Sequence, residues 1–134
     1  MEHKQLLTVF NSLPVGIGFF TADGTLVRCN ESFCRIFGAD SQTLLGNKLN
    51  INENSVVPDV VKEAVRRCVP VQMSFLYDFD KQRTDKRFFS TRTRTCYLKC
   101  NGNPLYDNDG KFVNYIFIFE DITETVKSEE VLRQ

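Results

Sequence analysis

The most informative hydrophobic pattern of the chain lies in its last long apolar stretch, residues 107–124 (DNDGKFVNYIFIFEDITE). A turn at residues 107–110 leads into a predicted strand over residues 112–121 that is apolar on both faces. One face holds Tyr115, Phe117 and Phe119, and the other holds Phe112, Ile116 and Ile118. A strand of this kind is covered on both sides. We therefore expect the central helices to cover one face, and the N-terminal helix or a partner subunit to cover the other.

Helical spacing of apolar side chains predicts five helices, over residues 2–12, 31–37, 41–45, 58–68 and from Thr123 to the end of the chain. Leu6, Leu7 and Phe10 form one stripe on the first helix, and Asn30 can cap the second. The long central helix presents one apolar face, made of Val60, Val61, Ala64, Val65 and Cys68.

A β-hairpin is predicted near the N-terminus, where an Asp23-Gly24 turn joins strands over residues 16–22 and 25–29. Residues 71–79 alternate apolar and polar side chains, which is typical of a strand with one face in water.

Residues 47–55 and the charged segment 80–86 are predicted as loops. A returning strand is then expected over residues 87–100, interrupted by a bulge or bend at residues 101–104. The complete order is helix, two strands, three helices, three strands and helix. Because the strands form antiparallel hairpins, the predicted fold class is α+β.

Composition limits the classes of partner. The chain has 17 basic and 17 acidic residues and no net charge, so nothing in that balance favours nucleic acid or an anionic membrane. No apolar run approaches the ~20 residues that cross a bilayer, and no secretion signal is present, so we expect a cytoplasmic protein.

The five cysteines lack CxxC spacing, which favours free thiols in a reducing compartment over a metal site.

Three segments together resemble a PAS domain, over residues 6–124. GIGFFTADGTLVRCNESFCRIFG (residues 16–38) resembles the first PAS hairpin and the helix after it. LKCNGNPLYDNDGKFVNYIFIFEDITE (residues 98–124) resembles the last two PAS strands, and EDITE (residues 120–124) resembles the junction between a bacterial PAS core and its output helix. The resemblance implies a five-stranded antiparallel sheet with short helices packed on one face.

The resemblance also implies a division of the chain into an N-terminal flanking helix (residues 1–13), a PAS core (14–123) and the start of a C-terminal signalling helix (124–134). In this family the core binds a small molecule, a cofactor or another protein, and passes a conformational bias to an attached output domain.

No cofactor is predicted. Haem-binding PAS domains supply an axial histidine from the helix that corresponds to residues 58–68, and the one histidine of this chain is His3. Flavin is not expected either, because the reactive-cysteine motif of light-sensing members is missing. A small organic ligand remains open, in a pocket with walls from Phe33, Phe37, Val61, Val65, Met73, Phe75, Tyr115 and Phe117. The alternative is that these side chains fill the core.

Two polar features have a mechanical or binding interpretation. Asp121 can accept backbone N–H bonds at the start of the last helix, and Thr123 can cap that helix, so the two predict a signal junction. Arg92 and Arg94 would share a strand face and could bind a carboxylate, although alternating Thr and Arg is also typical of a solvated face.

No catalytic residues are predicted, because the sequence offers no convincing Ser/His or Cys/His pair and no phosphate-binding glycine loop. We interpret the chain as a PAS sensor module of a larger bacterial signalling protein, with a histidine kinase as the expected parent. A homodimer is expected, with the Leu6, Leu7 and Phe10 stripe against the outer face of the last strand. One alternative is a ligand-free PAS domain for dimerisation or protein docking, and another is a small α+β enzyme.

Overall fold

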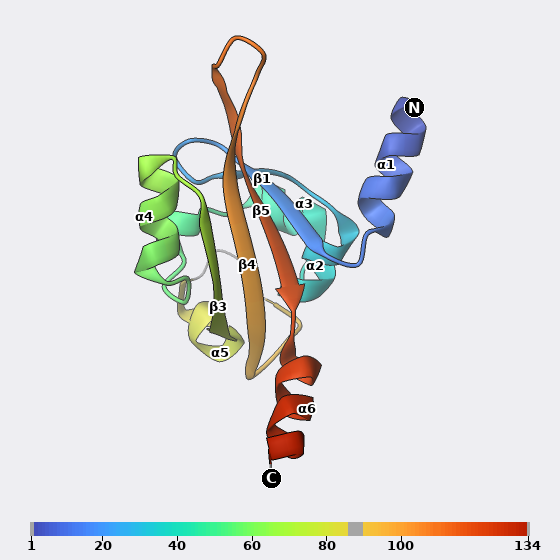
Figure 1. Cartoon of the computed structure of the whole chain (residues 1–134), viewed down its shortest axis with the longest axis vertical. Coiled ribbons are helices and arrows are strands. Elements are labelled where there is room, and N and C mark those ends of the chain that lie inside the picture. Colours follow the sequence, from blue (N-terminus) through green and yellow to red (C-terminus); the bar gives the residue numbers. More distant parts are fainter. Residues whose placement is uncertain (1, 86–89, 134) are drawn as a thin grey trace.

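The computed structural model describes residues 2–85 and 90–133 (Figure 1). Six α-helices are present in that part of the chain: α1 His3–Ser12, α2 Glu31–Phe37, α3 Ser41–Gly46, α4 Asp59–Arg67, α5 Phe79–Gln82 and α6 Thr123–Arg133. Two 3-10 turns cover η1 Ile51–Glu53 and η2 Arg83–Asp85. The strands are β1 Gly16–Phe20, β2 Leu26–Cys29, β3 Val71–Asp78, β4 Thr95–Tyr106 and β5 Phe112–Asp121. The predicted α+β class is confirmed.

The strands form one antiparallel sheet in the order β2-β1-β5-β4-β3. The last strand in sequence therefore lies in the middle, between β1 and β4. Phe117 at its centre is paired with Gly18 on one side and Gly102 on the other. A Cβ atom on Gly102 would lie 2.6 Å from a ring carbon of Phe117, and one on Gly18 would lie 2.8 Å from a ring carbon of Phe33. The two glycines leave the space that these aromatic rings occupy.

One face of the sheet carries the core. Tyr115, Phe117 and Phe119 of β5 are buried there, under α2, α3 and α4. The opposite face of β5 is only half covered, since Ile116 and Ile118 are half-buried. We expected α1 or a partner subunit on this face, but α1 lies to one side, against α2, and contacts β1 through the rings of Phe10 and Phe19 (Figure 1).

The strand predicted from residue 87 begins at Thr95 instead. Residues 86–89 lie outside the described part of the chain, and residues 90–94 are irregular, with a left-handed backbone at Arg94 (φ 64°). The interruption predicted at residues 101–104 is also wrong, because β4 continues through them to Tyr106. Pro104 is tolerated there because β3 begins at Val71, opposite Gly102, so residues 103–106 of β4 have no partner strand on that edge.

Smaller differences concern the loops and α4. The predicted loop at residues 80–86 contains most of α5 and η2, and the loop at 47–55 contains η1. Val60, expected on the buried face of α4, is 64% exposed. In the part of the chain that is described, no helix has both the length and the apolar character needed to span a bilayer.

The side chain of Asn30 fixes the junction between α1, β1 and α2. Its Oδ1 accepts from the backbone N–H of Ile17 (2.8 Å) and of Phe33 (3.0 Å). Its Nδ2 donates to the carbonyls of Phe10 and Val15, both at 3.0 Å. Asn30 is 1% exposed, so water cannot take over these bonds.

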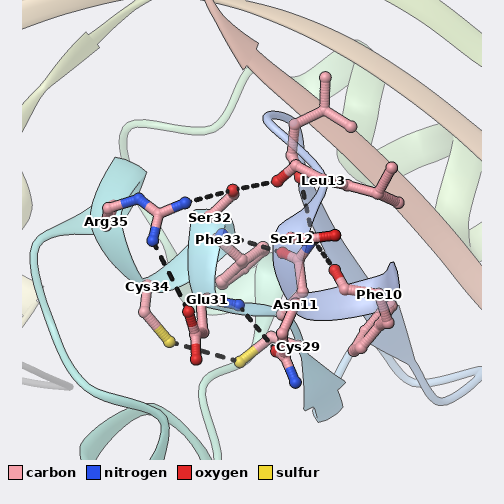
Figure 2. A network of polar contacts seen from close by, with 12 residues as sticks. Phe10, Asn11, Ser12, Leu13, Cys29, Glu31, Ser32, Phe33, Cys34 and Arg35 are labelled. Atoms are coloured by element: carbon pink, nitrogen blue, oxygen red, sulfur yellow. Dashed lines mark hydrogen bonds and ion pairs between the residues drawn. The ribbon is translucent and has the colours of Figure 1, made fainter. Parts of the chain in front are cut away.

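Two contacts beside Asn30 complete the link between the helices (Figure 2). The Asn11 side chain accepts from the first N–H of α2, at Glu31 (3.2 Å). The Ser32 hydroxyl donates to the carbonyl of Leu13. The C-terminal end of α1 is therefore tied to the N-terminal end of α2 at several points.

Replacing Asn30 with alanine should lower the free energy of unfolding by about 3 kcal/mol, because two N–H groups and two carbonyls lose their partner in a buried place. Urea denaturation followed by circular dichroism measures this change. Asn11→Ala removes a single bond at the same junction and should cost less than about 1 kcal/mol. Equal losses for the two variants would contradict the central position given to Asn30.

Candidate functional site

The first candidate site is an interior cavity between the sheet and the helices. It is lined by Phe20, Phe33, Phe37, Leu49, Asn50, Ile51, Asn54, Val57, Phe75, Tyr77 and Phe119. Its volume is about 20 Å³, which is room for about one water molecule. Packed rings take most of the space: Phe37 lies edge-on to Tyr77, with ring centroids 5.4 Å apart, and to Phe119 at 5.3 Å. A larger ligand would have to displace aromatic side chains.

A polar pair lies in the wall of this cavity. The Asn54 amide donates to the Tyr77 hydroxyl at 2.8 Å, and both residues are buried. This pair places buried polar atoms in a cavity wall that is otherwise mostly apolar. The alternation of residues 71–79 put Tyr77 on the inner face of its strand, whereas Asn54 lies in a segment with no periodic signal.

The second candidate site is the exit junction, which we define as Asp121 and Thr123 at the start of α6. The Asp121 carboxylate accepts from the backbone N–H of Thr123 (3.0 Å) and from its hydroxyl (2.5 Å). The same hydroxyl accepts from the backbone N–H of Tyr97 in β4 (3.0 Å), and the Tyr97 carbonyl accepts from Ile122 N–H (2.9 Å). The sequence suggested that Thr123 caps α6. In the structure its hydroxyl also binds α6 to β4 of the sheet.

Arg92 connects the exit junction to the helical layer. Its guanidinium donates to the Asp121 carboxylate (3.1 Å) and to the carbonyl of Ile36 near the end of α2 (2.9 Å). The guanidinium also lies over the ring of Phe79, 4.8 Å from its centroid. Because residues 90–94 are not a strand, Arg92 and Arg94 do not form the shared strand face that the sequence suggested. The carboxylate that Arg92 binds belongs to the chain itself.

The charge of Asp121 is favoured by these contacts. Partial burial acts against ionisation, but the hydrogen bonds from Thr123 and Arg92 and the positive charge of Arg92 outweigh it. The pKa of Asp121 is therefore held below its ordinary value of 3.8.

The third candidate site is the α1 groove, which we define by its lining residues His3, Leu6, Leu7, Val9, Phe10, Leu13, Phe19 and Arg28. It is an open apolar hollow of about 370 Å³ between α1 and the outer face of the first hairpin. Leu6 is 53% exposed and Leu7 40% exposed, whereas Phe10 contacts the ring of Phe19 at a centroid distance of 6.0 Å.

A protein-family model described as "PAS fold" matches residues 10–127. The chain belongs to the PAS family. The resemblance deduced from three sequence segments is confirmed, and with it the expected five-stranded sheet. PAS domains are generally sensory modules without catalytic residues. No curated protein matches the chain.

Solved structures of other PAS-type proteins have the same fold. An RNA-binding light-oxygen-voltage receptor matches with a TM-score of 0.73 and 18% identity, over 98% of this chain and 36% of the receptor. A PAS domain from Colwellia psychrerythraea matches with a TM-score of 0.66 and 16% identity, over 90% of this chain and 97% of that domain. A PAS domain from a two-component sensor histidine kinase gives a TM-score of 0.62 and 14% identity, over 88% and 94%. At these identities the likeness concerns the fold alone.

The eight residues proposed for a ligand pocket are divided by the PAS fold into two groups. Phe33, Phe37 and Phe75 line the interior cavity. The other five lie in the core or against it, outside the cavity wall: Val61, Val65, Met73, Tyr115 and Phe117. The Tyr115 hydroxyl donates a hydrogen bond to the Val69 carbonyl at 2.6 Å, so it already has a partner within the fold.

Replacing Asp121 with asparagine should destabilise the PAS domain near neutral pH and have a smaller effect in acid. A carboxylate whose folded-state pKa is lowered stabilises the fold above its unfolded pKa, and that stability is lost as the pH falls through the folded pKa. The difference in unfolding free energy between wild type and Asp121→Asn should therefore shrink below about pH 3.8. Urea denaturation at a series of pH values measures it. A difference that stays constant with pH would show that the charge of Asp121 is not involved.

Proposed function

We propose that this PAS domain is the signal-input module of a larger signal-transduction protein, with a histidine kinase as the parent, and that its output leaves through α6. The observation that carries this proposal is the exit junction. Asp121 and Thr123 bind the first turn of α6 to β4, and Arg92 binds the same carboxylate to α2. A displacement of the sheet or of α2 therefore changes contacts that hold the exit helix.

The input we infer is a partner protein or a mechanical change in the flanking segments. The interior cavity supports this choice, because about 20 Å³ admits water but no organic molecule unless the rings of Phe37 and Tyr77 move. A small ligand stays the alternative input, and the Asn54 amide with the Tyr77 hydroxyl would be the polar group it meets after such a movement. Neither input needs catalysis by this domain.

The proposed mechanism is a shift between two populations of the exit helix. In one, the Thr123 hydroxyl is bound to Tyr97 and Asp121, and α6 is held against the end of the sheet. In the other, these bonds are broken and α6 is free to rotate. Each hydrogen bond that is exchanged for one with water contributes about 1 kcal/mol. A partner that binds one of the two states of α6 moderately better can therefore change the ratio of their populations.

The proposal that the parent protein is a histidine kinase is based on similarity of fold. The PAS domain from a two-component sensor histidine kinase supports it. The RNA-binding light-oxygen-voltage receptor belongs to another kind of protein, so the fold by itself does not select the output. The cytoplasmic location stays a prediction from the sequence.

A second function, dimerisation or protein docking, is favoured by the α1 groove. Leu6, Leu7 and Val9 are each at least 40% exposed, and together they leave an apolar face on α1. Exposed apolar surface of this kind is typical of an interaction site. We infer that a second copy of this chain covers it and that the two α6 helices then leave the dimer as a pair.

Replacing Thr123 with valine should release α6 while the core stays folded. The variant keeps the side-chain volume but loses the bonds to Tyr97 and Asp121. Amide hydrogen exchange in residues 123–133 should become several-fold faster, since each lost bond is worth about 1 kcal/mol. Mass spectrometry of the exchanged protein measures this.

Thr125→Val is the matched control, because it changes the same residue type on the same helix outside the exit junction. Exchange in α6 should stay as in the wild type for this variant. If Thr123→Val also left α6 exchange unchanged, the junction would not hold the helix and the proposed output route would be wrong.

Replacing Leu6 and Leu7 with glutamate should convert a dimer into a monomer, because two charges per protomer would have to be buried in the α1 groove. Native mass spectrometry of freshly purified protein measures the dimer and also any bound small molecule. Val60→Glu is the control, since Val60 is an exposed apolar residue on α4, away from the groove. A wild-type chain that is monomeric at high concentration would contradict the dimer, and a co-purified organic molecule would favour the ligand-binding alternative.

A further inference from the structure

Two cysteines face each other where β2 leads into α2. Cys29 is the last residue of β2, Cys34 lies on α2, and their sulfur atoms are 3.9 Å apart (Figure 2). Both side chains are half-buried, so small molecules have partial access to them. The buried thiols of Cys96 and Cys100 lie in the core instead.

We propose that Cys29 and Cys34 are a reversible dithiol–disulfide pair, which makes the β2–α2 junction a redox modification site. A disulfide bond is about 2.05 Å long, so the sulfurs must approach by roughly 2 Å, a distance that side-chain rotations can supply. The two residues are five positions apart in sequence, and the backbone between them is already held by the Asn30 cap. The proposal does not depend on ligand binding or on the kinase parent.

The oxidant would be a low-molecular-weight disulfide, such as oxidised glutathione. The Cys34 thiolate attacks one sulfur of this disulfide, which forms a mixed disulfide and releases one small thiolate; that thiolate takes up the proton lost by Cys34. The Cys29 thiolate then attacks the sulfur of Cys34, which forms the Cys29–Cys34 bond and releases the second small thiolate, protonated by the proton from Cys29. Two electrons pass from the protein to the small disulfide, and two small thiols result.

The surroundings of the pair decide which thiol attacks and how fast. Burial raises the pKa of Cys29 to about 12. Burial also raises the pKa of Cys34, and the negative charges of Asp40 and Glu31 add to the rise, whereas the hydrogen bond shared with Cys29 and the positive charge of Arg35 oppose it. We assign Cys34 as the attacking thiol, because it is the less deeply buried of the two and lies near the positive charge of Arg35. At neutral pH the exchange is slow, and its rate should rise about tenfold per pH unit.

Bond formation would act on the α1–α2 junction. The bridge would span Asn30, whose side chain holds the carbonyls of Phe10 and Val15. When Cys29 and Cys34 rotate towards each other, both ends of residues 29–34 shift. This segment positions the side-chain amide of Asn30. Oxidation should therefore change the protection of α1 amides, residues 3–12, and leave β3 and β4 unaffected.

The test uses the whole chain, equilibrated with reduced and oxidised glutathione at several ratios, alkylated and digested with trypsin. Cleavage after Arg28 and Arg35 leaves both cysteines in one peptide, CNESFCR, and puts Cys68, Cys96 and Cys100 in three other peptides. With increasing oxidised glutathione, CNESFCR should lose two hydrogens and escape alkylation. Excess reduced glutathione should reverse this.

Single variants separate the two steps. In Cys29→Ser, Cys34 should stop at the glutathione adduct, whereas Cys68→Ser, the control, should still form the Cys29–Cys34 bond. The proposal is overturned if the bond appears at no glutathione ratio, or if it forms only in urea. Hydrogen exchange compares the reduced and oxidised chains, and identical protection of residues 3–12 would overturn the coupling to α1.

Discussion

The side-chain amide of Asn30 is the contact on which the arrangement of this domain depends. It satisfies four backbone groups at once, at the end of α1, around the start of β1 and in the first turn of α2. A helix, a strand and a second helix therefore meet at one side chain, and the bonds of Asn11 and Ser32 support the same junction. Because α1 is held at its C-terminal end, its apolar face is positioned beside the sheet and left open to a partner.

The packing of the interior allows a signal to pass without an empty pocket. Gly18 and Gly102 flank Phe117, and the absence of two Cβ atoms is used by aromatic rings rather than left as a void. Interiors packed in this way move as connected elements, because a local displacement cannot be absorbed by free space. A contact at one edge of the helical layer is therefore passed to its neighbours.

Periodicity was sufficient to predict the fold class and the order of the five strands and of every helix except α5, since these elements are amphipathic and bounded by turn residues. The family followed from the resemblance of three sequence segments to a PAS domain. It failed at residues 90–94, where alternating Thr and Arg looks like a solvated strand. The position of Arg92 is decided by Ile36, Phe79 and Asp121, which are distant in sequence. The Asn54–Tyr77 pair was missed for the same reason, because a loop asparagine gives no periodic signal.

The two ends of α2 give the domain a physical connection between its flanking helices. At the N-terminal end, Asn11 and Asn30 bind the first turn of α2 to α1. At the C-terminal end, the Ile36 carbonyl binds Arg92, which in turn holds the carboxylate at the start of α6. A helix of seven residues is too short to bend appreciably, so a tilt imposed at one end must appear at the other. The Cys29–Cys34 pair lies at the N-terminal end of α2. A covalent bond formed there would therefore be transmitted through α2 to the contacts of its C-terminal end.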